Sequence, residues 1–181
     1  MSTPSEAPAS STPEVIYSGS HIEAVRVGRW EYVRRKNASG VVIIVAVTPD
    51  GELILVEQPR TPVGTTVIEL PAGLAGDITG AEDEALETAA LRELEEETGW
   101  HAKTITRLVA GPVSAGLTSE IVTFFRADGL TRIGEGGGDA TEQITVHHVP
   151  LAEVPTFIAK RIAAGAMVDP KVFAGLYFAT R

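Results

Sequence analysis

Residues 82–100, EDEALETAALRELEEETGW, decide the fold. Ala, Leu and Glu, which are strong helix formers, dominate this stretch, and neither Pro nor Gly interrupts it before Gly99. The sequence therefore predicts a helix over residues 82–98, with Gly99 as its C-terminal stop. Leu91 and Leu94 lie close together on the helical wheel, so we expect them to anchor the helix to a core.

The predicted helix is acidic, with eight acidic residues and a single basic one, Arg92. Glu93, Glu96 and Glu97 fall within an arc of roughly 100°. They also crowd the C-terminal end of the helix, where the helix dipole favours cations. Such a run is usually a solvated acidic face, but carboxylates on one arc are also the ligands that Mg²⁺ and Mn²⁺ prefer. From the residues alone, both interpretations stay open.

Short segments rich in β-branched and aromatic residues surround this helix. They predict strands over residues 15–17, 22–27, 30–35, 41–47, 53–56, 65–70, 104–110, 121–127 and 143–149. Pro49-Asp50-Gly51 is typical of a tight turn, so we expect residues 41–58 to form a hairpin. Helices near residues 151–164 and 170–180 close the chain. This order of elements predicts an α/β (α+β) sandwich.

Composition excludes several classes of function. A chain of 181 residues fits one domain, and its net charge of −9 disfavours nucleic acid as a partner. Phosphate substrates remain possible where a divalent cation supplies positive charge. The absence of cysteine excludes disulfides and a cysteine nucleophile, and fits the cytoplasm. The longest apolar run, residues 41–47, is too short to cross a membrane, and residues 1–14 predict a disordered tail with no signal peptide.

Residues 92–100, RELEEETGW, resemble the core of the Nudix box, R-E-U-x-E-E-x-G-U, in which U is a bulky apolar residue. Glu84 stands eight residues before the arginine, as the box requires. Residues 69–73, ELPAG, are similar to the segment before the helix in the branch that hydrolyses ADP-ribose and nucleotide sugars. The family usually has five residues between the first glycine of the box and its first glutamate. Here residues 74–83 fill that interval, which indicates a loop insertion.

The resemblance implies a Nudix-type α/β/α sandwich with a mixed sheet over residues 40–181. Residues 15–39 are expected to form an N-terminal antiparallel strand extension that makes the protein a homodimer. The cofactor implied is Mg²⁺, with Mn²⁺ as a substitute. The metal ligands implied are Glu93, Glu97, the backbone carbonyl of Ala72, and Glu96 for a second metal or its water.

Arg92 is expected to hold the glutamates in place by ion pairing, with support from Glu84. The alternative for Arg92 is an exposed ion pair with Glu96, which contributes only about 0.3–0.5 kcal/mol.

The branch also carries an acidic residue on a mobile loop after the box, and residues 134–150, GEGGGDATEQITVHHVP, match this loop. Glu142 is then in register with the glutamate that binds metal or acts as the base. Asp139 is the alternative base, and an ordinary strand-edge carboxylate is the other interpretation of Glu142. The glycines of residues 134–138 are expected to form a flexible loop that closes on substrate.

The residues expected to bind the substrate are implied by the same resemblance. Trp30 is expected to stack on the nucleobase, in its own site or in that of the partner subunit, and a packed strand tryptophan is the alternative. Arg35 and Arg60 match arginines that meet phosphate or the terminal sugar, unless they are ordinary surface residues. The remaining residues expected at the substrate are Glu69, Ala115 and Gly116. ADP-ribose enzymes often have Pro where this chain has Ala115, which leaves other nucleotide sugars open.

Together these features predict a Mg²⁺-dependent enzyme that hydrolyses the diphosphate bond of ADP-ribose or a related nucleoside diphosphate sugar. The expected catalytic residues are Glu142, Glu96 and Arg92. One alternative is a nucleoside triphosphate pyrophosphatase of the same fold. Another is a Nudix-like module that binds nucleotides without hydrolysing them, although the intact set of glutamates argues against it.

Overall fold

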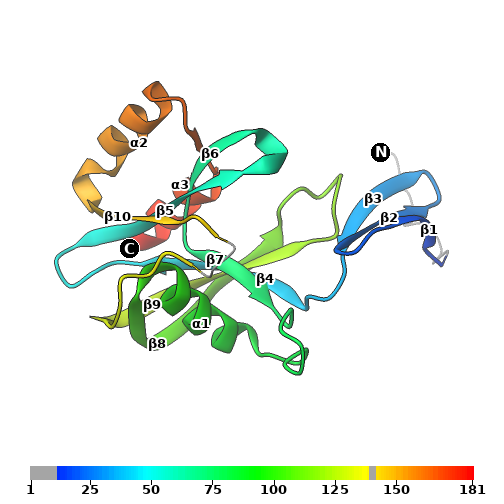
Figure 1. Ribbon diagram of the computed structural model, residues 1–181, viewed down its shortest axis with the longest axis horizontal. Helices are drawn as coiled ribbons and strands as arrows, with labels where there is room; N and C mark the ends of the chain where they lie inside the picture. The colour runs from blue at the N-terminus through cyan, green and yellow to red at the C-terminus, as the bar shows by residue number, and fades with distance from the viewer. Residues whose placement is uncertain (1–11, 139–141) are drawn as a thin grey trace, which may run out of the picture.

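The computed structural model describes residues 12–138 and 142–181 (Figure 1). The strands are β1 (Glu14–Ser18), β2 (Ile22–Val27), β3 (Trp30–Arg35), β4 (Gly40–Ala46), β5 (Glu52–Arg60), β6 (Thr65–Glu69), β7 (Ala72–Ala75), β8 (Trp100–Pro112), β9 (Ile121–Arg132), β10 (Thr145–Pro150) and β11 (Met167–Val168). The helices are α1 (Leu86–Thr98), α2 (Val154–Ala163) and α3 (Lys171–Ala179), with short 3₁₀ segments η1 (Thr61–Val63) and η2 (Leu151–Glu153). The predicted tail over residues 1–14 falls mostly outside the described residues, and Glu14 already belongs to β1.

Within the described residues the strands form three sheets. The N-terminal strands make an antiparallel sheet of order β1-β2-β3, which projects from one side of the body in Figure 1. The body holds two four-stranded sheets, of order β10-β5-β6-β11 and β7-β4-β9-β8. Both are mixed, because β4 runs parallel to β9 and β11 runs parallel to β6. The predicted mixed sheet and N-terminal strand extension are therefore present.

The predicted hairpin over residues 41–58 forms only next to its turn, where Val47 and Leu53 make a single antiparallel bridge, and the rest of the two strands pair elsewhere. β4 pairs with β7 and β9, whereas β5 pairs with β6 and β10 in the other sheet. The turn at Pro49-Asp50-Gly51 does exist, but it carries the chain from one sheet to the next. Both strands are buried on both faces, and such continuous apolar runs contain no signal for which neighbour they will pair with.

Helix α1 begins at Leu86, so the predicted start at residue 82 is four residues too early. Residues 82–83 lie in a turn, and Ala85 at the N-cap has an extended backbone. Good helix formers precede Leu86, but they are not helical because the inserted loop must first bring the chain back to the body of the protein. The strands β7 and β11 were not predicted, since each is short and β7 contains Gly73.

The core lies on both faces of the sheet that contains β4. One cluster fills the space between the two body sheets and the inner faces of α2 and α3, with Ile43, Leu55, Ile68, Phe124, Ile158 and Val172. The other packs α1 against the opposite face, with Val42, Ile44, Ala90, Leu94 and Phe125. Leu94 is fully buried and Leu91 partly so, which confirms that they anchor the helix.

Burying a leucine side chain contributes roughly 1.5–3 kcal/mol, so this packing fixes α1 rigidly on the sheet. The layers are those of the predicted α/β/α sandwich. Among the described helices, none is long and apolar enough to cross a membrane.

Candidate active site

A cleft of about 410 Å³ opens where β7 and α1 face β5 and β6. Its acidic lining residues are Glu69, Asp77, Glu93, Glu97, Glu120, Glu142 and Asp169. Its basic lining residues are Arg35, Arg60 and Lys171. Because carboxylates outnumber cations among these described residues, an anionic ligand would need an added cation to bind here.

Glu97 is the most deeply placed of these carboxylates, with 2% of its surface exposed. Its Oε2 accepts a hydrogen bond of 3.0 Å from the backbone N–H of Ala72 on β7. Burial raises the pKa of Glu97 to about 9; the Ala72 bond opposes this shift, and the nearby Glu93 and Glu142 add to it. A carboxylate is therefore costly at this position unless a positive charge approaches it.

Glu93 lies one helical turn before Glu97 and also faces β7. Burial raises the pKa of Glu93 to about 7, against the lowering effect of Arg92. A Cβ atom at Gly73 would lie 1.9 Å from the carboxyl carbon of Glu93, so the β7 backbone passes directly against this carboxylate. Any other residue at position 73 would displace the glutamate.

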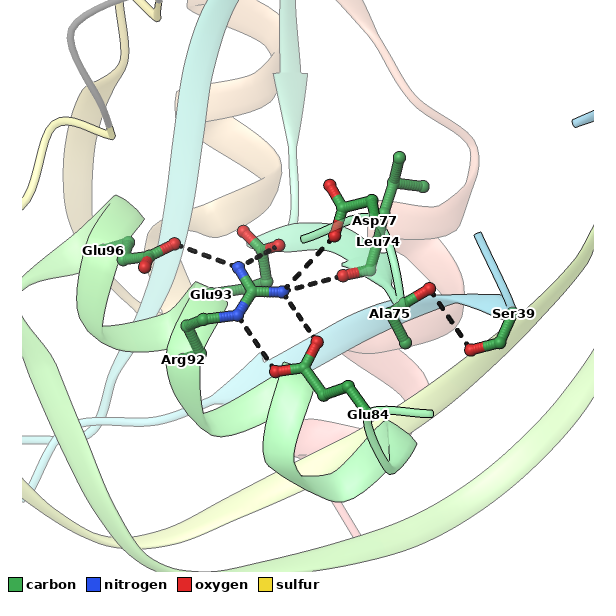
Figure 2. A network of polar contacts seen from close by, with 8 residues as sticks. All are labelled: Ser39, Leu74, Ala75, Asp77, Glu84, Arg92, Glu93 and Glu96. Atoms are coloured by element: carbon green, nitrogen blue, oxygen red, sulfur yellow. Dashed lines mark hydrogen bonds and ion pairs between the residues drawn. The ribbon is translucent and has the colours of Figure 1, made fainter. Parts of the chain in front are cut away.

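Arg92 is the centre of the polar network in Figure 2. Its Nε and Nη2 donate to the two oxygens of Glu84 at 3.1 and 3.0 Å, and Nη2 also donates to the carbonyl of Leu74 at 2.9 Å. Its Nη1 donates to Glu93 at 2.8 Å and to Glu96 at 3.1 Å. The bonds to Glu84, and then the charge of Glu93, raise the pKa of Arg92 above its usual value. An exposed pair with Glu96 would explain one of these contacts but not the other four.

The inserted loop adds a carboxylate that the sequence analysis missed. Asp77 lies 3.8 Å from Arg92, on the side of the guanidinium away from Glu96 (Figure 2). Gly76 has a φ of +74°, and a Cβ there would lie 2.6 Å from the carbonyl oxygen of Glu82, so the loop folds back tightly on itself. Other unpredicted cleft residues are Gln58, Asp169 and Lys171, and Glu120 at the end of the segment that holds Ala115 and Gly116 also lines the cleft. The only signal that the sequence offered for these residues was their charge or polarity. The topology of the fold brings their segments to the cleft, and the sequence pattern does not show this.

The two predicted arginines line the cleft, and each is held by a carboxylate. Arg60 contacts Glu69 at 2.6 Å, and Gln58 donates to the same glutamate at 3.1 Å. Burial lowers the pKa of Arg60, but Glu69 outweighs it and the net pKa is raised. Arg35 contacts Glu120 at 2.8 Å. Both guanidinium groups therefore lie at the wall of the cleft, each paired with a carboxylate.

Glu142 also lines the cleft, whereas its alternative Asp139 lies outside the described residues. Residues 134–138, which were expected to form a flexible loop, contact α1 in the structure. The N–H groups of Gly137 and Gly138 donate to carbonyls of α1, at Glu97 and Glu96, over 2.8 and 3.0 Å. The segment before Glu142 is thus docked on the end of the helix.

Five predicted site residues do not line the cleft, and Arg92, whose contacts are given above, is one of them. The Glu96 side chain is 51% exposed and turns toward Arg92. Trp30 lies on the projecting N-terminal sheet, 48% exposed, with the guanidinium of Arg29 5.7 Å from its ring centre. Ala115 and Gly116 belong to a turn that bonds β3, where the N–H of Val33 donates to Leu117 at 2.8 Å.

The donor set nevertheless suits a hard divalent cation. Within residues 12–138 and 142–181, no three His, Asp or Glu side chains stand close enough together to form a metal site as they are. Glu93 and Glu97 offer carboxylate oxygens, however, and their raised pKa values show that their charge is poorly compensated. A divalent cation that prefers oxygen ligands compensates the negative charge of these two carboxylates.

An acidic cleft beside a glutamate-rich helix is the kind of site that can bind a divalent cation and, through it, an anionic substrate. The family model for the NUDIX domain matches residues 36–167. The chain therefore belongs to the Nudix family, as residues 92–100 predicted.

The relatives agree with this assignment. The ADP-ribose pyrophosphatase of Bacillus subtilis (strain 168) is 35% identical over 155 residues, covering 82% of this chain and 81% of that protein. The ADP-ribose pyrophosphatase of Mycobacterium tuberculosis is 35% identical over 138 residues, covering 76% of this chain and 63% of that protein. A crystal structure described as an ADP compounds hydrolase shares the fold, with a TM-score of 0.64, 21% identity and 94% of each chain covered. The predicted fold class is thereby confirmed.

Proposed function

We propose that this Nudix hydrolase cleaves the diphosphate bond of ADP-ribose or a related nucleoside diphosphate sugar, using Mg²⁺. The products are a nucleoside monophosphate and a sugar phosphate. The observation that carries the proposal is a cleft lined by partly buried Glu93 and buried Glu97 together with Arg35 and Arg60. The names of the relatives support the substrate class.

Divalent metal is general among Nudix ADP-ribose pyrophosphatases, and the residues proposed to hold it here lie on α1 and β7. Glu93, Glu97 and the carbonyl of Ala72 would bind the first ion, with Mn²⁺ able to replace Mg²⁺. Glu96 and Glu142 would bind a second ion or its water. A divalent cation in this place neutralises the diphosphate and lowers the pKa of bound water.

The chain itself would supply binding, orientation and proton transfer. Arg92 holds the carboxylates of Glu93 and Glu96 in place. Arg35 and Arg60 would bind the diphosphate or the sugar, because a planar guanidinium matches phosphate oxygens in pairs. Glu69 fixes the direction of Arg60. Glu142 would take the proton from the water that attacks phosphorus, as the P–O bond to the leaving phosphate breaks.

Trp30 would serve a second copy of the chain. The N-terminal sheet exposes Val15, Ile16, Tyr17, Ile22 and Trp30, an unusual density of large apolar side chains for a surface. A homodimer that covers this sheet would bring Trp30 to the nucleobase in the partner's cleft, beside the turn that holds Ala115 and Gly116. A cytoplasmic location is proposed with it, since the chain has no cysteine.

A substrate panel tests the proposal. ADP-ribose, ADP-glucose, GDP-mannose, a dinucleoside polyphosphate and the nucleoside triphosphates are each assayed with Mg²⁺, and products are identified by chromatography. We expect turnover of ADP-ribose and of at least one hexose derivative, with kcat/KM values within about a hundredfold, because a contact or two changes specificity by only ~1–3 kcal/mol. Turnover confined to triphosphates would overturn the substrate class.

A further inference from the structure

The C-terminal end of α1 is closed by a segment that comes much later in the chain. The last carbonyls of a helix have no partner within it and must find one elsewhere. Gly99 N–H donates to Glu95 at 2.9 Å, which is an ordinary helix stop. The next two carbonyls, of Glu96 and Glu97, accept bonds from Gly138 and Gly137 instead. We call residues 134–138 the glycine strap.

The strap requires glycine for two reasons. Gly136, Gly137 and Gly138 have φ values of +72°, +112° and +79°, which L side chains rarely adopt. The strap also lies too close to α1 for a side chain, since a Cβ at Gly136 would stand 2.4 Å from the carbonyl carbon of Thr98. The end of α1 also has no room for a side chain facing the strap, because a Cβ at Gly99 would stand 2.3 Å from the carbonyl oxygen of Gly134. The run of glycines therefore fits close docking rather than freedom of motion.

The strap also contacts Glu142 directly. A Cβ at Gly138 would lie 2.3 Å from Oε2 of Glu142 and 2.9 Å from its Cβ, so the glutamate side chain packs over the strap. Just beyond Glu142, β10 begins at Thr145, which pairs with Glu57 on β5. Glu142 is therefore held between a backbone docked on α1 and a strand of the opposite sheet.

We propose that the glycine strap is a positioning element, which sets Glu142 in register with the carboxylates of α1. The same peptide units that bear Glu96 and Glu97 accept the bonds from the strap, so a shift of α1 would carry the Glu142 segment with it. This proposal rests on the role proposed above for Glu142. A strap that only capped the helix would matter for stability but not for the proton transfer by Glu142.

The first experiment compares alanine variants at glycines of matched backbone. In Gly138→Ala the new methyl group meets Glu142, and in Gly136→Ala it meets the backbone of Thr98. Gly51→Ala is the control, because Gly51 has the same φ of +79° as Gly138 but has nothing within 4 Å of its Cβ position. We expect both strap variants to lose at least about tenfold in kcat, since small misplacements of a reacting group cost up to 10²-fold. KM for ADP-ribose should stay within about threefold, and the control within about twofold of wild type in kcat.

A double-mutant cycle then asks whether the strap acts through Glu142. In a Glu142→Gln background, Gly138→Ala should lower kcat by less than about twofold more, because the coupled group is already gone. Full additivity of the two losses would overturn the proposal. If Glu142→Gln alone kept half of wild-type kcat, the role of Glu142 would fail and the strap proposal with it. If that variant lost activity but both strap variants kept half, the strap proposal alone would fail.

Amide hydrogen exchange on the wild-type chain tests whether the strap is docked on α1, even if a strap variant does not fold. The Gly137 and Gly138 amides should exchange at least about a hundredfold more slowly than in an unstructured peptide, because both are donors to α1. Exchange of both amides at the unprotected rate would show that the strap is not docked in solution and would overturn the proposal.

Discussion

Glu97 illustrates how a single side chain here is placed by its neighbours. It points inward from α1, receives the N–H of Ala72, and lies near Glu93 and Glu142. Ordinary helices avoid this arrangement, since burial and like charges both disfavour a carboxylate. A fold keeps such an unfavourable arrangement of carboxylates where it serves the function, so this cluster marks the active site.

Glu97→Gln should remove most turnover while the fold persists. The amide has the same shape and can still accept the Ala72 hydrogen bond, but it contributes no negative charge to a metal site. We expect a loss of at least about 100-fold in kcat, equal to about 2.7 kcal/mol of transition-state stabilisation. Glu87→Gln, an exposed residue of the same helix, is the control and should change kcat little. Retention of half of wild-type kcat at saturating Mg²⁺ would contradict the assignment.

The predictable part of the site is the part that lies within one continuous motif. Arg92, Glu93 and Glu97 follow each other at helical spacing, so their convergence could be read from the sequence. Asp77 and Lys171 could not, because they reach the cleft through an inserted loop and through the start of α3. Charge in a loop or beside a helix carries no information about which distant cleft it will line.

At the scale of elements, local patterns say least about strand pairing and docking. The hairpin over residues 41–58 and the glycine-rich loop over residues 134–138 were both inferred from such patterns. Strand partners and docking sites are decided by non-local packing instead. β4 lies between β7 and β9 because that arrangement buries both its faces, and the glycine strap docks because α1 offers unpaired carbonyls. Helix α1 itself was predictable, since its signal is local.

Mg²⁺ should stabilise the protein through α1. Ligand that binds only the folded state adds about 2.7 kcal/mol of stability at a hundred times its Kd. We therefore expect the Tm to rise with MgCl₂ by several degrees more than with NaCl at the same ionic strength. The shift should disappear in the Glu93→Gln/Glu97→Gln double variant. Equal shifts with the two salts would mean charge screening rather than a site.

Glu57 links β5 to β10 and to helix α2, and it should make the free energy of unfolding depend on pH. This carboxyl on β5 is 8% exposed, and it is bonded to Arg161 of α2 and, at 2.9 Å, to His147 of β10. Burial by itself raises the pKa of Glu57, but the bonds from Arg161 and His147 outweigh it and the net pKa is lowered. A lowered pKa means that the carboxylate stabilises the fold fully above its unfolded pKa of 4.5, and that this contribution is lost as pH falls through the folded value.

Urea unfolding at several pH values tests the Glu57 prediction. The difference in unfolding free energy between wild type and Glu57→Gln should be largest near pH 7 and shrink as pH falls below about 4.5. Glu87→Gln serves again as the control and should show a small, nearly constant difference. A Glu57→Gln difference that grew on acidification would have the wrong sign and would refute the linkage.

At the scale of the whole molecule, the projecting N-terminal sheet reaches the cleft at one end of β3 only (Figure 1). Arg35 at that end lines the cleft together with the carboxylates and Arg60 of the body, whereas Trp30 at the other end of the same strand does not line it. A second copy of the chain is the arrangement that would join Trp30 to a cleft. Light scattering should therefore report a dimer at micromolar concentration, which should persist when residues 1–12 are deleted and be lost when residues 1–36 are deleted.

Mixing two variants with different defects tests whether Trp30 serves the partner's cleft. Trp30→Ala should weaken substrate binding, since stacking of a base on an aromatic ring contributes about 1–3 kcal/mol, and Glu97→Gln should abolish turnover. If Trp30 acts across the dimer, a mixed dimer has one cleft with both defects and one with neither. Unfolding and refolding the two variants together should then restore activity at low substrate concentration, toward a quarter of wild type for random pairing. If Trp30 acts within its own chain, every cleft of the mixed dimer carries one defect, and activity at low substrate will not exceed that of the two variants refolded apart.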